Sequence, residues 1–116
     1  MSIFKSQVRT FTTDITGEEL ELRINNMVWV VLQDKFGVTQ KAYQEETEEE
    51  QMIMGAKFIT AVLIANGHET TLDEVLEHTD ETSVADFNFA YNTVLTEEMN
   101  KVLNKHFPKA EEAKTK

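Results

Sequence analysis

The 116-residue sequence contains no cysteine and only one proline. Without thiols, the chain has no disulfide bond, no thiolate nucleophile and no zinc–sulfur site. Its four glycines are scattered at positions 17, 37, 55 and 67, so no glycine-rich loop is present to cradle a phosphate. No apolar run approaches the roughly 20 residues of a membrane span, and the first five residues do not resemble a signal peptide. We therefore expect a soluble, cytosolic protein.

Basic residues are also scarce. Lysine and arginine number 11 against 21 aspartates and glutamates, a net charge of −10. Nonspecific binding to nucleic acid or to anionic lipid requires the opposite sign, so the charge argues against both partners. Residues 58–100 contain nine acids and no lysine or arginine, whereas residues 101–116 contain five lysines and two glutamates. The acidic region is either a solvated surface or a docking surface for a basic partner, and its contrast with residues 101–116 favours head-to-tail contacts between copies.

Apolar and charged residues, at 41% and 28%, are balanced as in a folded globular chain. We predict one mainly α domain over residues 1–107, with about four main helices, followed by a disordered charged tail at 108–116. Residues 1–25 are expected to be extended or irregular. Within them, Leu20, Leu22 and Ile24 alternate with polar residues, which predicts a half-exposed strand, and residues 8–12 are its candidate hairpin partner.

The four helices are predicted near residues 26–36, 48–66, 72–79 and 84–106. Asn25 or Asn26 is expected to begin the first helix, and Gly37 and Gly67 to end the first and second. The pairs with capping-box spacing are Thr47–Glu50, Thr71–Glu74 and Ser83–Asp86. Inside the second helix, Gly55 is expected to let another helix approach closely.

The last helix has the most regular apolar spacing in the sequence. Its stripe consists of Val84, Phe87, Tyr91, Leu95, Met99 and Val102. Such a stripe is typical of a helix that faces a core. We therefore expect both Tyr91 and Leu95 to be buried.

Motifs that carry chemistry are missing or incomplete. Residues 68–72 begin like a zinc-protease motif, but Leu72 occupies the position of the second histidine. His78 and His106 lack the glutamate three residues earlier that di-iron helical bundles use. Because no serine-nucleophile or calcium-loop spacing occurs either, we predict a protein that is not an enzyme, with no catalytic residues, no metal site and no cofactor.

Four apolar residues, Met54, Phe58, Ile64 and Phe89, lie partly off the main helical stripes. They are either core fillers or exposed apolar residues surrounded by acids, which is the usual appearance of a protein-interaction patch. On the second interpretation they are partner-binding residues, in a groove formed chiefly by the second and last helices.

Three stretches, taken in order, carry a resemblance to a known family. They are residues 19–24 (ELELRI) leading into a helix that ends with Lys35-Phe36-Gly37, residues 58–65 (FITAVLIA) followed by residues 71–76 (TLDEVL), and a last helix with Phe87, Tyr91, Val94 and Leu95. Over residues 8–107 the chain resembles the tail assembly chaperones of long-tailed bacteriophages, such as those of lactococcal siphophages. The resemblance implies a helical domain that self-associates and coats the tape measure protein before the tail tube polymerises.

The same resemblance implies a protein of the host bacterial cytoplasm that is absent from the mature virion. It also implies a homo-oligomer, and a longer frameshifted form that reaches the tail tube protein. The alternative function is an acidic, phage-encoded inhibitor or DNA mimic that occupies a basic cleft of a host protein. A mimic needs an ordered face of carboxylates, whereas a chaperone needs an apolar groove.

Overall fold

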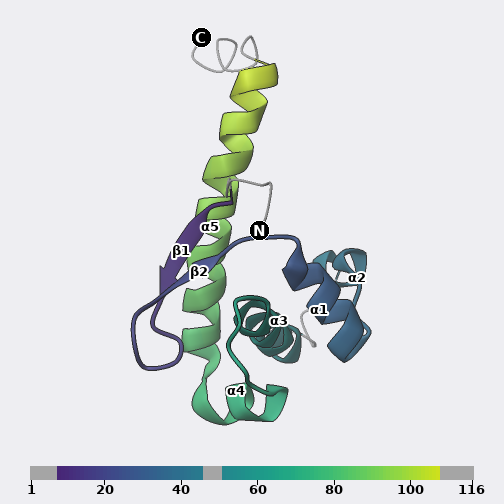
Figure 1. Ribbon diagram of the computed structural model, residues 1–116, viewed down its shortest axis with the longest axis vertical. Helices are drawn as coiled ribbons and strands as arrows, with labels where there is room; N and C mark the ends of the chain where they lie inside the picture. The colour runs from purple at the N-terminus through teal and green to yellow at the C-terminus, as the bar shows by residue number, and fades with distance from the viewer. Residues whose placement is uncertain (1–7, 46–50, 108–116) are drawn as a thin grey trace, which may run out of the picture.

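The computed structural model describes residues 8–45 and 51–107, in which two strands are followed by five helices. The elements are β1 (Thr10–Thr13), β2 (Leu20–Arg23), α1 (Met27–Phe36), α2 (Gln40–Gln44), α3 (Gln51–Ala65), α4 (Leu72–His78) and α5 (Glu81–His106). The predicted mainly α fold class, with a hairpin before residue 25, is confirmed. Figure 1 shows α3 between α1 and α5, with the hairpin along α5 and α4 at one end of the molecule.

The hairpin is stabilised by its packing on α5. Strands β1 and β2 are antiparallel, with Phe11 opposite Leu22, and both side chains are buried. The Phe11 ring meets the edges of Phe87 and Tyr91, with centroids 5.2 Å and 5.4 Å apart. An isolated hairpin is only marginally stable in water. The aromatic contacts with α5 supply the additional stability that this two-stranded sheet needs.

Helix α3 is the centre of the core. Its own side chains are buried at nearly every position after the first turn: Ala56, Phe58, Ile59, Thr60, Ala61, Val62 and Leu63. The hydroxyl of Thr60 donates to the carbonyl of Ala56 at 2.7 Å, which satisfies the polar group inside the core. A Cβ atom built on Gly55 would lie 2.7 Å from Cγ1 of Val84, so the predicted close approach of another helix at Gly55 is confirmed, and that helix is α5.

The ends of the helices show which capping residues act. Asn26 is the N-cap of α1, while the side chain of Asn25 accepts the Met27 N–H at 3.1 Å. Gly37 ends α1 with a φ of 66°, and Gly67 follows α3 with a φ of 86°, as predicted. Left-handed backbone of this kind favours glycine because it has no Cβ. The predicted start of the second helix at residue 48, its Thr47–Glu50 pair and the tail at 108–116 lie outside the described residues.

Two helix starts differ from the prediction. Helix α5 begins at Glu81 because Asp80, not Ser83, is its N-cap: Asp80 accepts the Ser83 N–H, and Ser83 accepts the Asp80 N–H, both at 2.8 Å. At α4 only half of the predicted capping box forms. Thr71 accepts the Glu74 N–H at 3.1 Å, but the Glu74 carboxylate accepts the Thr70 hydroxyl at 2.6 Å instead of reaching back to the cap.

The short helix α2 was not predicted from the sequence. It spans five residues, and its N-cap Thr39 accepts the Ala42 N–H at 3.0 Å. A helix of five residues is too short to show a 3.6-residue apolar period. Its capping residue, Thr39, is therefore the one local signal for it in the sequence.

The apolar stripe of α5 divides into a buried half and an exposed half. Val84, Phe87 and Tyr91 are buried, but Leu95 is 36% exposed and Met99 is 53% exposed. The expectation that Leu95 is buried is therefore wrong. The physical reason is that Leu95 lines a surface groove with Trp29 and Tyr43 instead of packing into the core. Beyond it, the last turns of α5 extend past the hairpin and the other helices (Figure 1).

Candidate functional site

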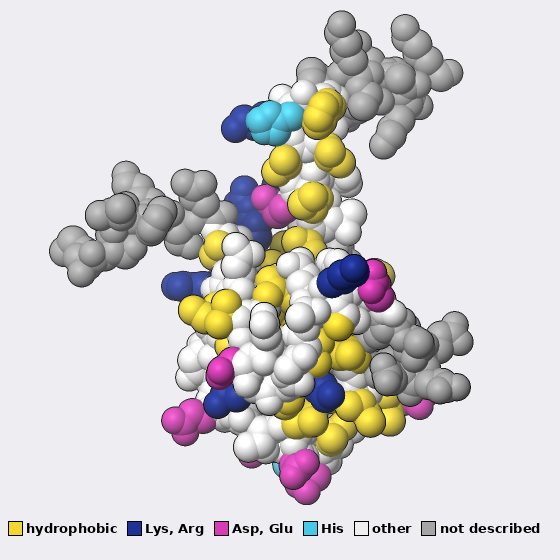
Figure 2. Space-filling view, turned by 90° about the vertical axis from the view of Figure 1, so that its right-hand side faces the viewer, with side chains coloured by type: hydrophobic (Ala, Val, Ile, Leu, Met, Phe, Trp, Pro, Cys, Tyr) yellow, Lys and Arg dark blue, Asp and Glu magenta, His cyan; other side chains and the backbone are white. Residues whose placement is uncertain are grey.

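An exposed apolar face occupies the carboxyl-terminal half of α5. It consists of Leu95, Met99 and Val102, which we call the distal stripe, and Leu103 lies beside it, about half exposed. Figure 2 shows hydrophobic side chains along the projecting end of the helix. Single exposed apolar residues need no explanation, but a continuous row on a projecting helix indicates a contact surface.

The distal stripe leads into a groove between α5 and the helices α1 and α2. The groove has a volume of about 500 Å³, and Leu95 and Met99 belong both to its wall and to the stripe. Opposite them, α1 supplies Trp29 and α2 supplies Tyr43. The groove and the stripe therefore form one apolar surface, which continues from the body of the domain onto the projecting helix.

Four aromatic rings, each from a different helix, build the inner part of this groove. The rings of Tyr43 and Phe58 stack at 4.8 Å, and the Tyr91 ring meets the Phe58 ring edge-on, also at 4.8 Å. Trp29 lies 5.7 Å from Tyr43 and 5.8 Å from Phe58. Because each ring is fixed by its neighbours, the groove is formed before any ligand arrives, which lowers the entropic cost of binding. We call these four residues the aromatic cluster.

As far as the described residues form it, the mouth of the groove is polar but uncharged. Its polar side chains are Asn25, Asn26, Gln40, Gln44 and Asn92. Amides both donate and accept hydrogen bonds, so they suit the polar flank of a peptide whatever its charge. Among the described lining residues there is no carboxylate.

The hydroxyl of Tyr91 stays neutral under physiological conditions. Burial raises the pKa of Tyr91 to about 12. The phenol is therefore protonated well above neutral pH, and it adds no charge to the groove.

A small ion-pair cluster marks the point where α5 leaves the body of the domain. The Glu98 carboxylate lies 2.9 Å from Nε of Arg9 and 3.2 Å from Nζ of Lys101. The hydrogen bond from Arg9, more than that from Lys101, lowers the pKa of Glu98. The Arg9–Glu98 ion pair links α5 to the segment that precedes β1. Because Glu98 is paired, it does not place a free negative charge beside the distal stripe.

The four residues predicted as partner-binding are not brought together. Phe58 is only 2% exposed because it is stacked inside the aromatic cluster, so it is not the exposed anchor that we expected, although it lines the groove. Met54 is half-buried against the core and Ile64 is also half-buried. Phe89 is 73% exposed on α5, but it does not line the groove.

Most residues of the groove were missed as site residues. Trp29 lies in the first predicted helix, where no site residue was expected, and Leu95 and Met99 were assigned to the core stripe. Tyr43 lies in α2, the helix that the sequence did not reveal. A signal was available for Met99, because the stripe runs on to Val102, near the end of a 26-residue helix, and one small domain does not cover a helix of that length along its whole extent.

Other kinds of site find no support in the described part of the chain. There, no group of three or more His, Cys, Asp or Glu residues is placed to hold a metal ion. No helix in residues 8–45 and 51–107 is both long and apolar enough to cross a membrane. Comparison of the chain with protein-family models, with curated proteins and with solved structures gives no match.

Proposed function

We propose that this protein is a tail assembly chaperone of a long-tailed bacteriophage, which binds apolar helical segments of the tape measure protein and keeps them soluble before the tail tube polymerises. The observation that carries the proposal is the aromatic groove that continues onto the distal stripe. Binding of this kind is non-catalytic, and it needs neither a cofactor nor a metal ion.

The groove suits a helical client. An amphipathic helix presents apolar side chains at every third or fourth position, and it binds by laying them into an apolar groove. Leu95 and Met99 are themselves one helical turn apart, so a client helix lying along α5 meets apolar groups at the same repeat. The amide mouth can pair with polar side chains at the edge of the client helix without selecting for charge.

The strong net charge has a separate role in this proposal. The chain carries −10, while the groove itself has no charged lining residue among those described. A charge far from zero keeps a protein soluble, so a client whose apolar side chains are covered by the groove acquires a charged exterior. The apolar surface thus binds the client, and the net charge keeps the complex soluble.

The remaining features of the proposal come with the family resemblance. The protein acts in the host cytoplasm, it is absent from the mature virion, and several copies line one tape measure chain as a homo-oligomer. Weak contacts repeated along one client add up through effective concentration, so a single groove need not bind tightly. A longer form of the protein would bring the tail tube protein to the same complex.

The DNA-mimic alternative has less support. A mimic binds through carboxylates, yet the described residues that line the aromatic groove include none. Glu98, an acid beside the distal stripe, is paired with Arg9 and Lys101.

The proposal is tested by co-expressing this protein with an apolar fragment of the tape measure protein from the same phage. We expect wild type to keep the fragment in the soluble fraction, and Met99→Glu to lose most of that effect because a charge enters the apolar surface. Met99 is half exposed, so the substitution leaves the fold intact. The matched control is Asn100→Glu, which adds the same charge one residue further along α5, about 100° around the helix.

Both variants are also melted to confirm that they are folded. A folded Met99→Glu variant that solubilises the fragment as well as wild type does would contradict the proposed groove. Failure of wild type itself to keep the fragment soluble would contradict the chaperone function.

A further inference from the structure

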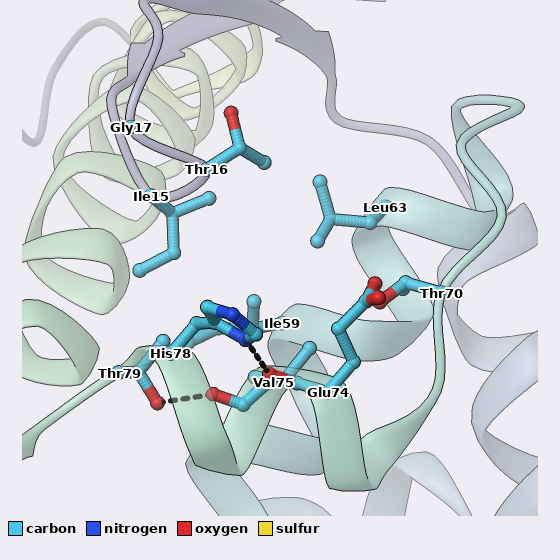
Figure 3. Close-up of a pocket in the computed structure, with 10 residues that line it drawn as sticks. All are labelled: Ile15, Thr16, Gly17, Ile59, Leu63, Thr70, Glu74, Val75, His78 and Thr79. Carbon is cyan, nitrogen blue, oxygen red and sulfur yellow. Dashed lines mark hydrogen bonds between the residues drawn. The ribbon is translucent and has the colours of Figure 1, made fainter.

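A second cavity lies at the opposite end of the molecule from the tip of α5. It has a volume of about 480 Å³ and lies between the turn that joins β1 to β2 and the helices α3 and α4 (Figure 3). We call it the turn pocket. Its apolar lining comes from Ile15 in the turn, Ile59 and Leu63 in α3, and Val75 in α4.

The polar groups of the turn pocket already have partners within the chain. The Thr70 hydroxyl donates to the Glu74 carboxylate at 2.6 Å, and Nδ1 of His78 donates to the Glu74 carbonyl at 2.8 Å. The Thr79 hydroxyl donates to the Val75 carbonyl at 2.7 Å (Figure 3). The pocket therefore lacks an unsatisfied polar group that would select a polar ligand. What it offers is an apolar interior with one carboxylate, that of Glu74, at its edge.

The end of α5 has the complementary chemistry. Phe107, which caps the helix, is 62% exposed, and Lys105 precedes it by two residues in the last turn. From residue 101 onward the sequence has five lysines against two glutamates, whereas residues 58–100, which include α4, have no lysine or arginine. An aromatic ring with lysines on both sides in the sequence is complementary to an apolar pocket with a carboxylate at its edge, in both hydrophobicity and charge.

Size is compatible with this match. An apolar cavity of about 150 Å³ suffices to bind benzene, and the turn pocket is larger. A phenyl ring therefore enters it with room for part of the helix end as well.

We infer that the turn pocket receives Phe107 of a second copy of this chain, with Lys105 of that copy beside Glu74. Phe107 cannot reach the turn pocket of its own chain, because α5 extends away from α4 (Figure 1). The two surfaces differ, so the contact is heterologous and each copy can continue the array at its other end. Leu95 and Met99 take no part in this contact, so it does not use up the apolar surface proposed for the client.

This inference deepens the proposed function by naming the contact between copies, but its test uses no tape measure protein. If the contact between copies is disproved, the chaperone function is unaffected. If the chaperone function is disproved, the contact between copies is likewise unaffected.

The first test is sedimentation velocity of the full chain over a range of concentrations at low ionic strength. We expect wild type to form a concentration-dependent series of oligomers that shortens as salt rises. Phe107→Ser should weaken the association about 30-fold or more, because an anchor residue is removed from its pocket. The matched control, Phe89→Ser, removes an equally exposed ring from the same helix and should change nothing.

Charge reversal identifies the partner of Phe107. Lys105→Glu and Glu74→Lys should each weaken association, and an equimolar mixture of the two variants should restore it, because each copy then meets an opposite charge. A wild type that remains monomeric, a Phe107→Ser variant that associates like wild type, or a mixture no better than either variant alone would overturn the inference.

The absence of cysteine permits a second, positional test. A variant with Thr16→Cys at the edge of the turn pocket is mixed with one carrying His106→Cys, and the mixture is mildly oxidised. We expect a disulfide-linked heterodimer. The control pairs Thr16→Cys with Asn100→Cys, two turns before the end of α5, and should cross-link far less; equal yields from the two pairs, or none from the first, would overturn the proposed contact.

Discussion

At Gly55, a single hydrogen atom in place of a side chain sets the distance between α3 and α5. A Cβ atom there would lie 2.7 Å from Val84 and 3.3 Å from Nδ2 of Asn88. In an isolated helix, Gly→Ala stabilises by about 1 kcal/mol. In this core the added methyl group must push the two helices apart, and such overpacking costs about 1–3 kcal/mol.

We therefore expect Gly55→Ala to lower the free energy of unfolding by up to about 2 kcal/mol, the overpacking cost less the gain in helix propensity. Urea denaturation monitored by circular dichroism measures the change. In a Val84→Ala background the same substitution should be tolerated better, because the clashing methyl group is gone. A stabilising effect of Gly55→Ala in the wild-type chain would show that the helices are further apart than described.

The second residue-scale prediction concerns Tyr91. Its pKa of about 12 in the folded protein lies above the value of about 10 for an exposed tyrosine. Below pH 10 both states hold the proton and Tyr91 has no influence on the pH dependence. Between pH 10 and 12 only the folded state holds it, so stability falls as pH rises through this range.

Ultraviolet absorbance of a Tyr43→Phe variant isolates the ionisation of Tyr91. We expect a midpoint near pH 12 while the chain is folded, and a flatter fall of stability above pH 10 when Tyr91→Phe removes the group. A Tyr91 that ionises near pH 10 in the folded chain would mean that its ring is not held in the aromatic cluster.

At the scale of the elements, the two halves of α5 have different roles. Its first part packs on Phe11 and Phe58, and its last part carries the distal stripe without a described partner. We expect Phe87→Ala to cost about 3–5 kcal/mol and Met99→Ala less than about 1 kcal/mol. Urea denaturation of the two variants tests this division. Equal costs would show that the end of α5 is covered, and would remove the basis for the groove and stripe surface.

The helices and hairpin were predictable where a local pattern was strong. The alternation at Leu20–Ile24, the glycines after α1 and α3 and the spacing of α5 each depend on neighbouring residues alone. Helix α2 was missed because it is shorter than the period that reveals a helix, and the start of α5 was misplaced because serine and aspartate caps compete over a few residues.

The burial of Leu95 and Phe58 could not be read in the same way. Spacing identifies the apolar face of a helix, but not where the rest of the protein stops covering it. Leu95 lies where the cover of α5 ends, and Phe58 lies among rings from three other helices. The burial of both side chains depends on how the elements pack together, and the residue pattern of one helix carries no information about that packing.

At the scale of the whole molecule, the same limit explains why the candidate site was only partly foreseen. The sequence indicated apolar exposure on the second and last helices, and the last helix does provide it. The groove itself joins α1, α2, α3 and α5, residues far apart in the chain, and its aromatic rings are brought together only by folding. Charge, by contrast, was readable from the sequence because it depends on composition alone.

Trp29 offers the most direct measurement of client binding, since it is the only tryptophan in the chain and lines the groove. A synthetic apolar helical segment of the tape measure protein, carrying no tryptophan, is titrated into the full chain while Trp29 emission is recorded. The chaperone proposal predicts a saturable blue shift as the helix displaces water from the groove, and a much weaker response for Met99→Glu than for Asn100→Glu. A segment that binds, as shown by its own anisotropy label, without changing Trp29 emission would place the client elsewhere and contradict the groove as the binding site.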